Sequence, residues 1–257
     1  MRQKRLWIQI SIEGKARQEL NKYACYVSNL FTFYLPTVFI KTTCKLVVEL
    51  VSEDDAFYIF PADRGESIYT VRDTLLLDEF AGNDLDKLIL LAKRTISSLR
   101  KLYEHLGLQP ADIISGYNNI IENNFTLKTE LLKKRNRQGV KATLIVEYFL
   151  DFALIYIVFF DKEDNIIRKV DLFKTLPNHL FYSQLIHSAK WIGQSTFEVL
   201  NKSKETRINI NLDGETRVDY YPTGRDIEGI KQEIRYFSLE QMINIDAGKN
   251  YNLKLLH

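Results

Sequence analysis

The chain has 257 residues, of which 46% are hydrophobic and 26% charged, and its 35 basic and 33 acidic side chains give a net charge of +2. This composition excludes a disordered tail, a collagen-like fibre and a disulfide scaffold, and it supplies enough apolar residues for a full core. The near-neutral balance also excludes a uniformly basic nucleic-acid binder.

The first 124 residues alternate between strand and helix patterns. A strand opens the chain, an amphipathic helix follows, and several short strands precede a long helix that can begin at Asn83 or Asp84 and end at Gly107. Pro110 then stands at the start of a shorter helix. The predicted strands are residues 5–12, 38–41, 45–51, 56–60 and 67–76, and the predicted helices are residues 15–31, 83–107 and 110–123.

The rest of the chain begins with a meander of four strands and ends with a hairpin and a helix. Asn178 can cap a helix that extends to about Lys202, and Asp213-Gly214 is typical of a hairpin turn. The predicted strands are residues 126–134, 140–149, 153–160, 166–173, 206–212 and 216–221, and the predicted helices are residues 178–202, 226–235 and a short turn that Ser238 and Gln241 can cap.

These elements predict an α+β fold with an N-terminal lobe of residues 1–124 and a C-terminal lobe of residues 125–257. Each lobe is expected to contain an antiparallel sheet and a long helix, with a strand and helix added at the N-terminus and a hairpin and helix added at the C-terminus. Short matches between the halves, such as Val47-Val48-Glu49 with Ile145-Val146-Glu147, occur at offsets of 97 and 98 residues. They indicate either an internal duplication or a coincidence of two common α+β patterns.

Charge is distributed in opposing blocks along the chain. Residues 46–92 have a balance of −8, whereas residues 93–141 have a balance of +6. Such blocks either neutralise each other within the fold or leave acidic and basic surfaces for partners. In the second case Glu53, Asp54 and Asp55 form the predicted contact surface for a basic protein partner.

A basic turn within residues 133–141 gives a second candidate surface. Its basic side chains are Lys133, Lys134, Arg135, Arg137 and Lys141. Such a cluster could bind the phosphates of a nucleic acid, although no aromatic residue for base stacking lies within it. The structural alternative is a solvated hairpin tip.

Two further patterns have both a catalytic and a structural interpretation. Arg100 and His105 have the spacing R-x-x-x-x-H, which resembles that of an all-helical family of RNA-cleaving domains. The same residues fit a solvated helix end whose cations complement the helix dipole. The second pattern is a set of strand carboxylates that recur in both halves and either form acid–base pairs or face solvent: Glu49, Glu147, Asp73 and Asp171.

No glycine-rich phosphate loop, HExxH, GxSxG or zinc-binding Cys/His spacing occurs in the sequence, so we expect neither a metal nor a cofactor. Two cysteines in a chain of this length indicate a reduced, cytoplasmic compartment. The most apolar stretch, residues 144–160, contains Glu147 and Asp151 near its centre, so no membrane span is expected.

The preferred functional prediction is a bacterial-type accessory protein that binds another macromolecule and has no catalytic activity. A protein partner is preferred, and a toxin-neutralising immunity protein is one concrete version. The alternative is a protein that binds or processes nucleic acid through the basic hairpin of residues 133–141. A third hypothesis is an enzyme with a carboxylate site that no known motif marks.

Overall fold

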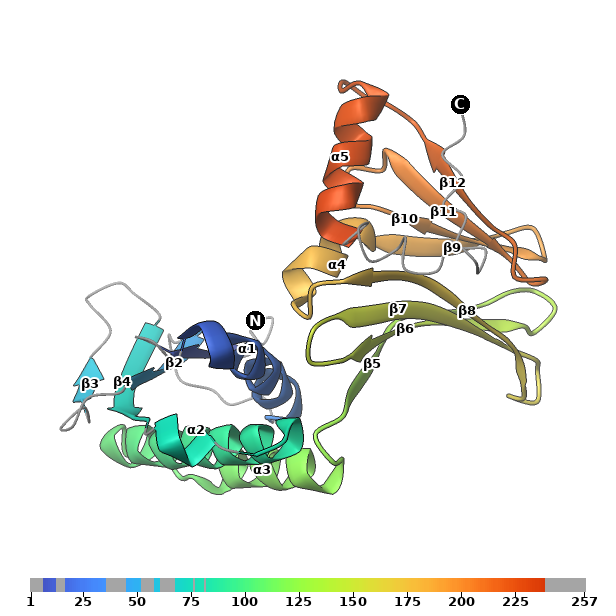
Figure 1. Cartoon of the computed structure of the whole chain (residues 1–257). Helices are drawn as coiled ribbons and strands as arrows, with labels where there is room; N and C mark the ends of the chain where they lie inside the picture. Colours follow the sequence, from blue (N-terminus) through green and yellow to red (C-terminus); the bar gives the residue numbers. More distant parts are fainter. Residues whose placement is uncertain are drawn as a thin grey trace. The chain divides into compact units, whose positions relative to one another are not determined.

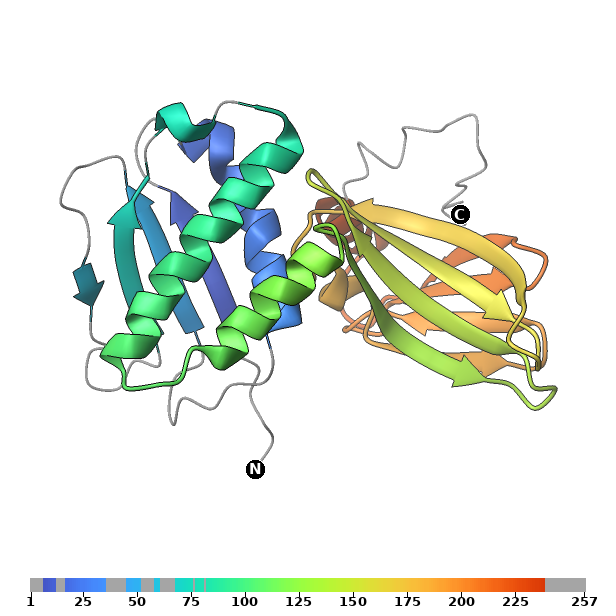
Figure 2. The ribbon, with the colours of Figure 1, turned by 90° about the horizontal axis from the view of Figure 1, so that it is seen from below.

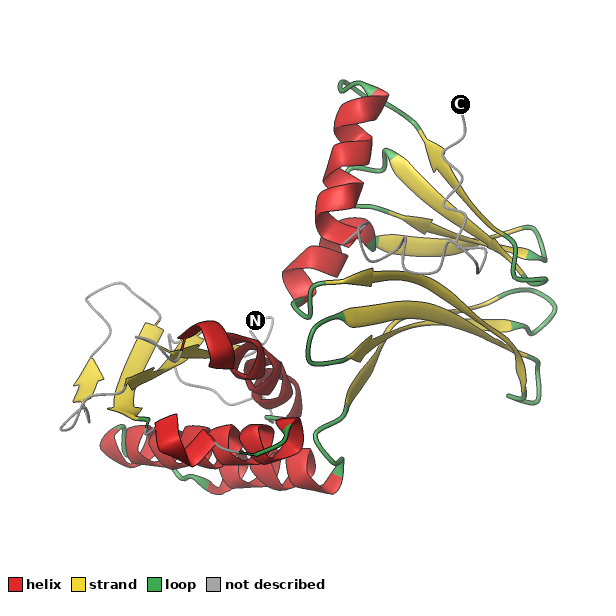
Figure 3. Ribbon diagram, in the orientation of Figure 1, coloured by secondary structure: helices red, strands yellow, loops and turns green. Residues whose placement is uncertain are grey.

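Helices and several sheets make up the computed structural model (Figures 1 and 3). It describes residues 7–12, 17–35, 45–51, 58–60, 68–75, 77–80 and 82–238. The α+β class is therefore confirmed. The chain divides into two compact units, Met1–Leu127 and Lys128–His257, which we call unit 1 and unit 2. The predicted strand of residues 38–41 and the predicted helical turn after Ser238 lie outside the described residues.

Unit 1 contains a four-stranded sheet in the order β1-β2-β4-β3. Its strands are β1 (Trp7–Ile12), β2 (Lys45–Val51), β3 (Tyr58–Phe60) and β4 (Ile68–Thr74). β2 pairs in parallel with both β1 and β4, whereas β3 runs antiparallel to β4. The antiparallel sheet predicted for this lobe is therefore wrong. The helix α1 (Arg17–Tyr34) lies between β1 and β2 in the chain, and such a crossover lets two neighbouring strands run in the same direction.

Two long helices lie along one face of the unit 1 sheet (Figure 2). The helices after β4 are η2 (Leu77–Phe80), α2 (Asp84–His105) and α3 (Ala111–Glu122). α2 begins where the sequence predicts, because Asn83 and Asp86 form a capping box in which each side chain accepts a backbone hydrogen bond from the other residue. Gly107, with φ of +67°, lets the chain leave the end of α2.

α1 lies beside β1, which is at an edge of the described sheet, and hydrogen-bonds to it. The Ser28 hydroxyl accepts a hydrogen bond from the Ile10 amide at 2.8 Å, and the Thr32 hydroxyl accepts one from the Ile8 amide at 3.0 Å. Within the described sheet these backbone groups have no strand partner on that side. Two side chains of α1 therefore provide the hydrogen-bond acceptors for these backbone N–H groups at the edge of the sheet.

Unit 2 contains two four-stranded sheets, in the orders β5-β6-β7-β8 and β12-β11-β10-β9. The strands of the first sheet are β5 (Leu127–Arg135), β6 (Lys141–Tyr148), β7 (Ala153–Phe160) and β8 (Ile166–Thr175). The strands of the second are β9 (Ser188–Ile192), β10 (Thr196–Leu200), β11 (Thr206–Asn211) and β12 (Thr216–Tyr220). β6 to β8 pair antiparallel, as do β9 to β12, which agrees with the predicted meander and hairpin.

Aromatic side chains join the two sheets of unit 2. The Trp191 ring lies 5.8 Å from that of Phe159 on β7 and 5.4 Å from that of Phe197 on β10, measured between ring centroids. The Trp191 indole N–H donates a hydrogen bond to the Lys134 carbonyl at 3.1 Å. Phe159 and Phe197 are fully buried, so this contact belongs to the core of unit 2.

The helix predicted for residues 178–202 is wrong. The chain forms only the short helix α4 (His179–Leu185) and then turns into the antiparallel pair of β9 and β10. Gly193, with φ of +64°, lies in the turn between these strands. Phe197 and Val199 both point into the core, so they follow the two-residue period of a strand. The other apolar residues of this segment have helical spacing, which hides the strand pattern in the sequence.

Ion pairs connect the start of the remaining helix, α5 (Ile227–Ser238), to the second sheet. Arg225, just before α5, donates hydrogen bonds to the carboxylates of Glu205 and Glu233. The hydrogen bonds from Arg225, together with those from Thr223, lower the pKa of Glu205 to about 2. Glu205 is therefore ionised, and the ion pairs hold the start of α5 in place.

The internal similarity is not confirmed as a duplication. The matching segments of residues 47–49 and 145–147 are both in strands, but the first lies in a parallel pair and the second in an antiparallel one. The match to Leu88-Ile89, in the long helix α2, falls at Leu185-Ile186, where α4 ends. Within the described part of the chain, no helix combines the length and apolar character that a membrane crossing needs.

Candidate functional site

On α2 and on α3 of unit 1, one stripe of apolar side chains packs into the core. On α2 the buried apolar residues are Leu88, Leu91, Ala92, Leu99, Leu102 and Tyr103. On α3 Ile113 and Ile120 are buried on either side of Gly116, whose missing side chain leaves room for Leu35. These residues account for the packing of both helices in unit 1.

A second apolar stripe on the two helices is left partly exposed. It consists of Leu85, Ile89 and Ile96 on α2 and Ile114 and Ile121 on α3. Leu85 is 49% exposed, Ile121 40% and Ile114 36%. The residues recur at spacings of four or seven along α2 and of seven along α3, so each set lies on one helix face. Their exposure marks a surface that the core of unit 1 does not use.

These side chains line a groove between α2 and α3. One hollow, of about 510 Å³, is lined by Lys93, Ile96, Ser97, Arg100, Lys101, Glu104, Ile114, Tyr117 and Asn118. A second, of about 570 Å³, is lined by Leu85, Ile89, Lys93, Tyr117, Asn118, Ile121, Glu122, Asn124 and Phe125. The two hollows share Lys93, Tyr117 and Asn118, so they form one continuous groove, which we call the α2–α3 groove.

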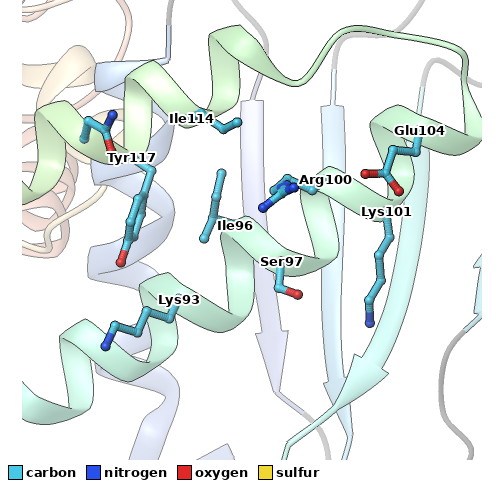
Figure 4. Close-up of a pocket in the computed structure, with 9 residues that line it drawn as sticks. Lys93, Ile96, Ser97, Arg100, Lys101, Glu104, Ile114 and Tyr117 are labelled. Carbon is cyan, nitrogen blue, oxygen red and sulfur yellow. The ribbon is translucent and has the colours of Figure 1, made fainter.

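The side chains of the first hollow are arranged around an apolar centre (Figure 4). Ile96 of α2 and Ile114 of α3 lie between the two helices, with Arg100 on one side of them and Lys93 on the other. The Lys101 side chain extends away from this centre. The groove therefore has an apolar floor with cations at its sides.

Two of these cations have no ionic partner within the described part of the chain. Neither Lys93 nor Arg100 forms an ion pair or a side-chain hydrogen bond with any residue that the structure describes, and both are exposed. Lys101 differs, because its ammonium group lies 3.0 Å from the Asp73 carboxylate. Lys93 and Arg100 are therefore the cations that remain available to an anionic ligand.

Asp73 is held as an ionised partner for Lys101. Partial burial raises the pKa of this carboxyl, but hydrogen bonds from Ser98, Lys101 and the Thr74 amide outweigh that effect and lower the pKa below its usual value. The Ser98 hydroxyl donates at 2.7 Å. In the groove itself, burial raises the pKa of Tyr117, so its phenol stays protonated and can donate a hydrogen bond.

The basic hairpin predicted from the sequence does form, but three of its five cations are paired with carboxylates. Asp164 lies 3.3 Å from the Arg135 guanidinium and 2.5 Å from the Lys141 ammonium, and Lys133 lies 3.5 Å from Glu130. The exposed cations at this tip that have no ionic partner among the described residues are Lys134 and Arg137. Hydrogen bonds from the Asn136 and Gln138 side chains to Gln194 also fix the tip.

The other predicted site residues are not brought together. Glu53, Asp54 and Asp55 lie outside the described residues. Of the recurring carboxylates, Glu49 accepts two hydrogen bonds from Arg72 at 3.0 and 3.1 Å, and Asp171 lies 3.4 Å from Lys169. Arrangements of this kind stabilise strand surfaces and do not resemble a shared acid–base pair.

Arg100 and His105 have separate surroundings in the structure. Arg100 lines the α2–α3 groove, whereas His105 lies in the last turn of α2 and lines neither hollow. This placement fits the helix-end interpretation of His105. Among the described residues no group of three or more His, Cys, Asp or Glu side chains is placed to hold a metal ion.

No protein-family model matches this chain, and no match was found among curated proteins or solved structures. The candidate site therefore depends on the geometry of the α2–α3 groove alone. Apart from Arg100, which belongs to the R-x-x-x-x-H pattern, the residues that form the groove were not identified as a site from the sequence. The sequence did contain a sign of it, since Leu85, Ile89, Ile114 and Ile121 make the apolar stripes of both helices wider than one buried face requires.

Proposed function

We propose that the protein is a binding protein without catalytic activity, and that the α2–α3 groove is the surface with which it engages a protein partner. The observation that carries this proposal is the apolar floor of the groove flanked by Lys93 and Arg100, two exposed cations without ionic partners among the described residues. Protein interfaces combine such exposed apolar centres with a charged rim.

The shape of the groove favours a macromolecule over a small molecule. Leu85, Ile114 and Ile121 are between one third and one half exposed, so both hollows open to solvent. Small-molecule sites enclose most of the ligand surface. An open, elongated groove instead offers contact area to a segment of another protein.

The charges of the groove favour a partner with an acidic contact surface. Lys93 and Arg100, near the middle of the groove, have no ionic partner among the described residues, whereas the lining carboxylates, Glu104 and Glu122, lie toward its ends. Complementary charge speeds association and fixes register. A toxin-neutralising role, with the groove bound to an acidic surface of the toxin, is a specific version of this proposal. The acidic segment at Glu53 to Asp55 remains a predicted contact for a basic partner.

The test is partner capture with matched variants. The full chain, an Arg100→Glu Ile114→Asp variant and a control with Lys202→Glu, an exposed position outside every candidate site, would each be used to isolate partners from the native host. The captured protein would then be purified and titrated by calorimetry. Both groove positions are exposed, so the fold should persist, which circular dichroism would verify. We expect at least a tenfold loss of affinity in the groove variant and none in the control. Equal affinity for all three proteins would refute the proposal.

The basic hairpin supports a second candidate function, which is binding to nucleic acid. Lys134 and Arg137 are exposed there without ionic partners among the described residues, although Asp164 neutralises two of their neighbours. A mobility shift of single- and double-stranded nucleic acid at low salt would test it. The expected shift disappears when Lys133, Lys134, Arg135 and Arg137 are replaced by glutamine. The absence of any shift with the wild-type protein at low salt would eliminate this candidate.

A further inference from the structure

We infer that the partner segment accepted by the α2–α3 groove is an amphipathic α-helix with two carboxylates seven residues apart. This inference rests on the function proposed above and specifies the chemistry of the partner. It follows from three features of the groove: the structure of its walls, the spacing of its apolar residues and the spacing of its unpaired cations.

The walls of the groove exclude an added strand. Both walls are α-helices, whose backbone N–H and C=O groups are bonded within each helix apart from the ends. A peptide strand binds by hydrogen-bonding to an open sheet edge, which these walls do not provide. Polyproline segments prefer grooves lined by several aromatic rings, whereas this lining has Tyr117 and the buried Phe125. Side-chain anchors from a helix remain as the recognition mode.

The length and apolar spacing of the groove match a helix of about five turns. Along α2 the lining extends from Leu85 to Glu104, which corresponds to about 28 Å at 1.5 Å per residue. The floor residues recur at intervals of four and seven positions on α2 and of seven positions on α3, as in Ile89 to Ile96 and Ile114 to Ile121. A helix packed between them would bury an apolar stripe of the same period.

The two unpaired cations determine where the partner carries charge. Lys93 and Arg100 are seven residues apart, which places them on the same face of α2 and about 10 Å apart along its axis. A helix that lies along the groove presents positions i and i+7 on one face at the same separation. Carboxylates at these two positions can therefore pair with both cations at once.

The two acidic lining residues restrict how that helix can be placed. Glu104 lies one turn beyond Arg100 on α2, and Glu122 lies at the end of α3 that lines the second hollow. A partner carboxylate shifted past either cation would meet one of these like charges, which is unfavourable. The charge pattern along the groove, with cations in the middle and carboxylates toward the ends, thus selects one register.

The test uses synthetic peptides of 18 residues with blocked ends, titrated against the full chain by fluorescence anisotropy. The matched peptide carries a leucine stripe and two glutamates seven residues apart. The control peptide has the same composition, but its glutamates are five residues apart and so point in different directions. We expect the matched peptide to bind at least tenfold more tightly at 50 mM salt, with a smaller advantage at 500 mM salt.

A charge exchange makes the assignment specific to Arg100. The Arg100→Glu protein should lose at least tenfold affinity for the matched peptide and regain it when the facing glutamate of the peptide is changed to lysine. The Lys202→Glu protein, with the same change of net charge at an exposed position of unit 2 outside every candidate site, should bind like the wild type. Equal binding of both peptides, or no recovery in the charge exchange, would overturn the inference. If the peptides fail in this way but binding of the natural partner still requires Arg100 and Ile114, the helical-partner inference is wrong and the proposed function stands. If binding of the natural partner does not require these residues either, the inference and the proposed function are both wrong.

Discussion

Removing two hydroxyl groups from α1 should destabilise unit 1 and expose a strand edge. The Ser28 and Thr32 hydroxyls accept hydrogen bonds from the Ile10 and Ile8 amides of β1. Ile8 and Ile10 are only 3% and 4% exposed, so water has little access to these amides once the hydroxyls are gone. The perturbation is the double variant Ser28→Ala Thr32→Val, which keeps the shape of residue 32 while both backbone donors lose their acceptors.

The expected loss follows from the number of orphaned donors. A buried backbone N–H without a partner costs about 1–3 kcal/mol, so the two together should lower the free energy of unfolding by about 2–6 kcal/mol. Domains are usually stable by about 5–15 kcal/mol, so this is a large fraction of the total. The urea midpoint should fall by about 1 M or more. The unsatisfied edge of β1 should also promote association between chains.

Urea denaturation followed by circular dichroism would give the change in the free energy of unfolding, and light scattering would detect association. Thr32→Ser is the matched control, because it keeps the acceptor and loses only a methyl group. We expect the control to lie close to the wild type and the double variant to be destabilised and prone to association. If the double variant loses less than about 0.5 kcal/mol and stays as monodisperse as the control, these hydroxyls do not support the β1 edge.

Three further predictions concern single positions. Because Arg225 and its neighbours hold the pKa of Glu205 at about 2, below its value in the unfolded chain, the resulting stability is fully present above the unfolded pKa and is lost as pH falls through about 2. Arg225→Gln should therefore flatten the acid side of the stability–pH curve measured by urea denaturation, and an unchanged curve would contradict this assignment. Burial raises the pKa of Tyr103 to about 12, and its hydroxyl has no hydrogen-bond partner among the described residues. Tyr103→Phe should accordingly leave the free energy of unfolding unchanged or raise it by up to about 1 kcal/mol, whereas a clear loss would reveal a hidden partner. A Cβ atom at Gly116 would lie 2.9 Å from the Leu35 side chain and 3.2 Å from its Cα atom. In Gly116→Ala, overpacking of about 1–3 kcal/mol should outweigh a gain of about 1 kcal/mol in helix propensity, and a more stable variant would show that α3 shifts without cost.

Local sequence patterns identified most of the described elements. Val47 and its neighbours alternate as β2 requires, and the Asn83 cap with Gly107 predicts both ends of α2 within two residues. These elements have signals that act within a few residues, namely caps, turn glycines and apolar periodicity. The meander of unit 2 was predicted for the same reason, because each strand pairs with its neighbour in the chain.

Patterns that depend on distant contacts were misread. Residues 188–200 have apolar side chains at helical spacing, but Phe197 and Trp191 lie in strands because they complete a core with Phe159 on the other sheet. In unit 1 the parallel pairing of β1, β2 and β4 depends on how α1 returns the chain, which strand alternation does not encode. Tertiary packing decided both outcomes.

The sequence by itself determined the α+β class, the positions of most helices and strands, and the opposing blocks of charge, because these depend on residue type and short-range period. Only the tertiary structure decided which charges remain available. It pairs Lys101 with Asp73 and Arg135 with Asp164, and leaves Arg100 beside an apolar groove. The sequence shows that α2 and α3 have more apolar residues than one buried face needs. These residues line a groove only because the two helices pack side by side and bury their other faces. An ion pair or a groove depends on which side chains meet, and that is set by packing between segments distant in the chain.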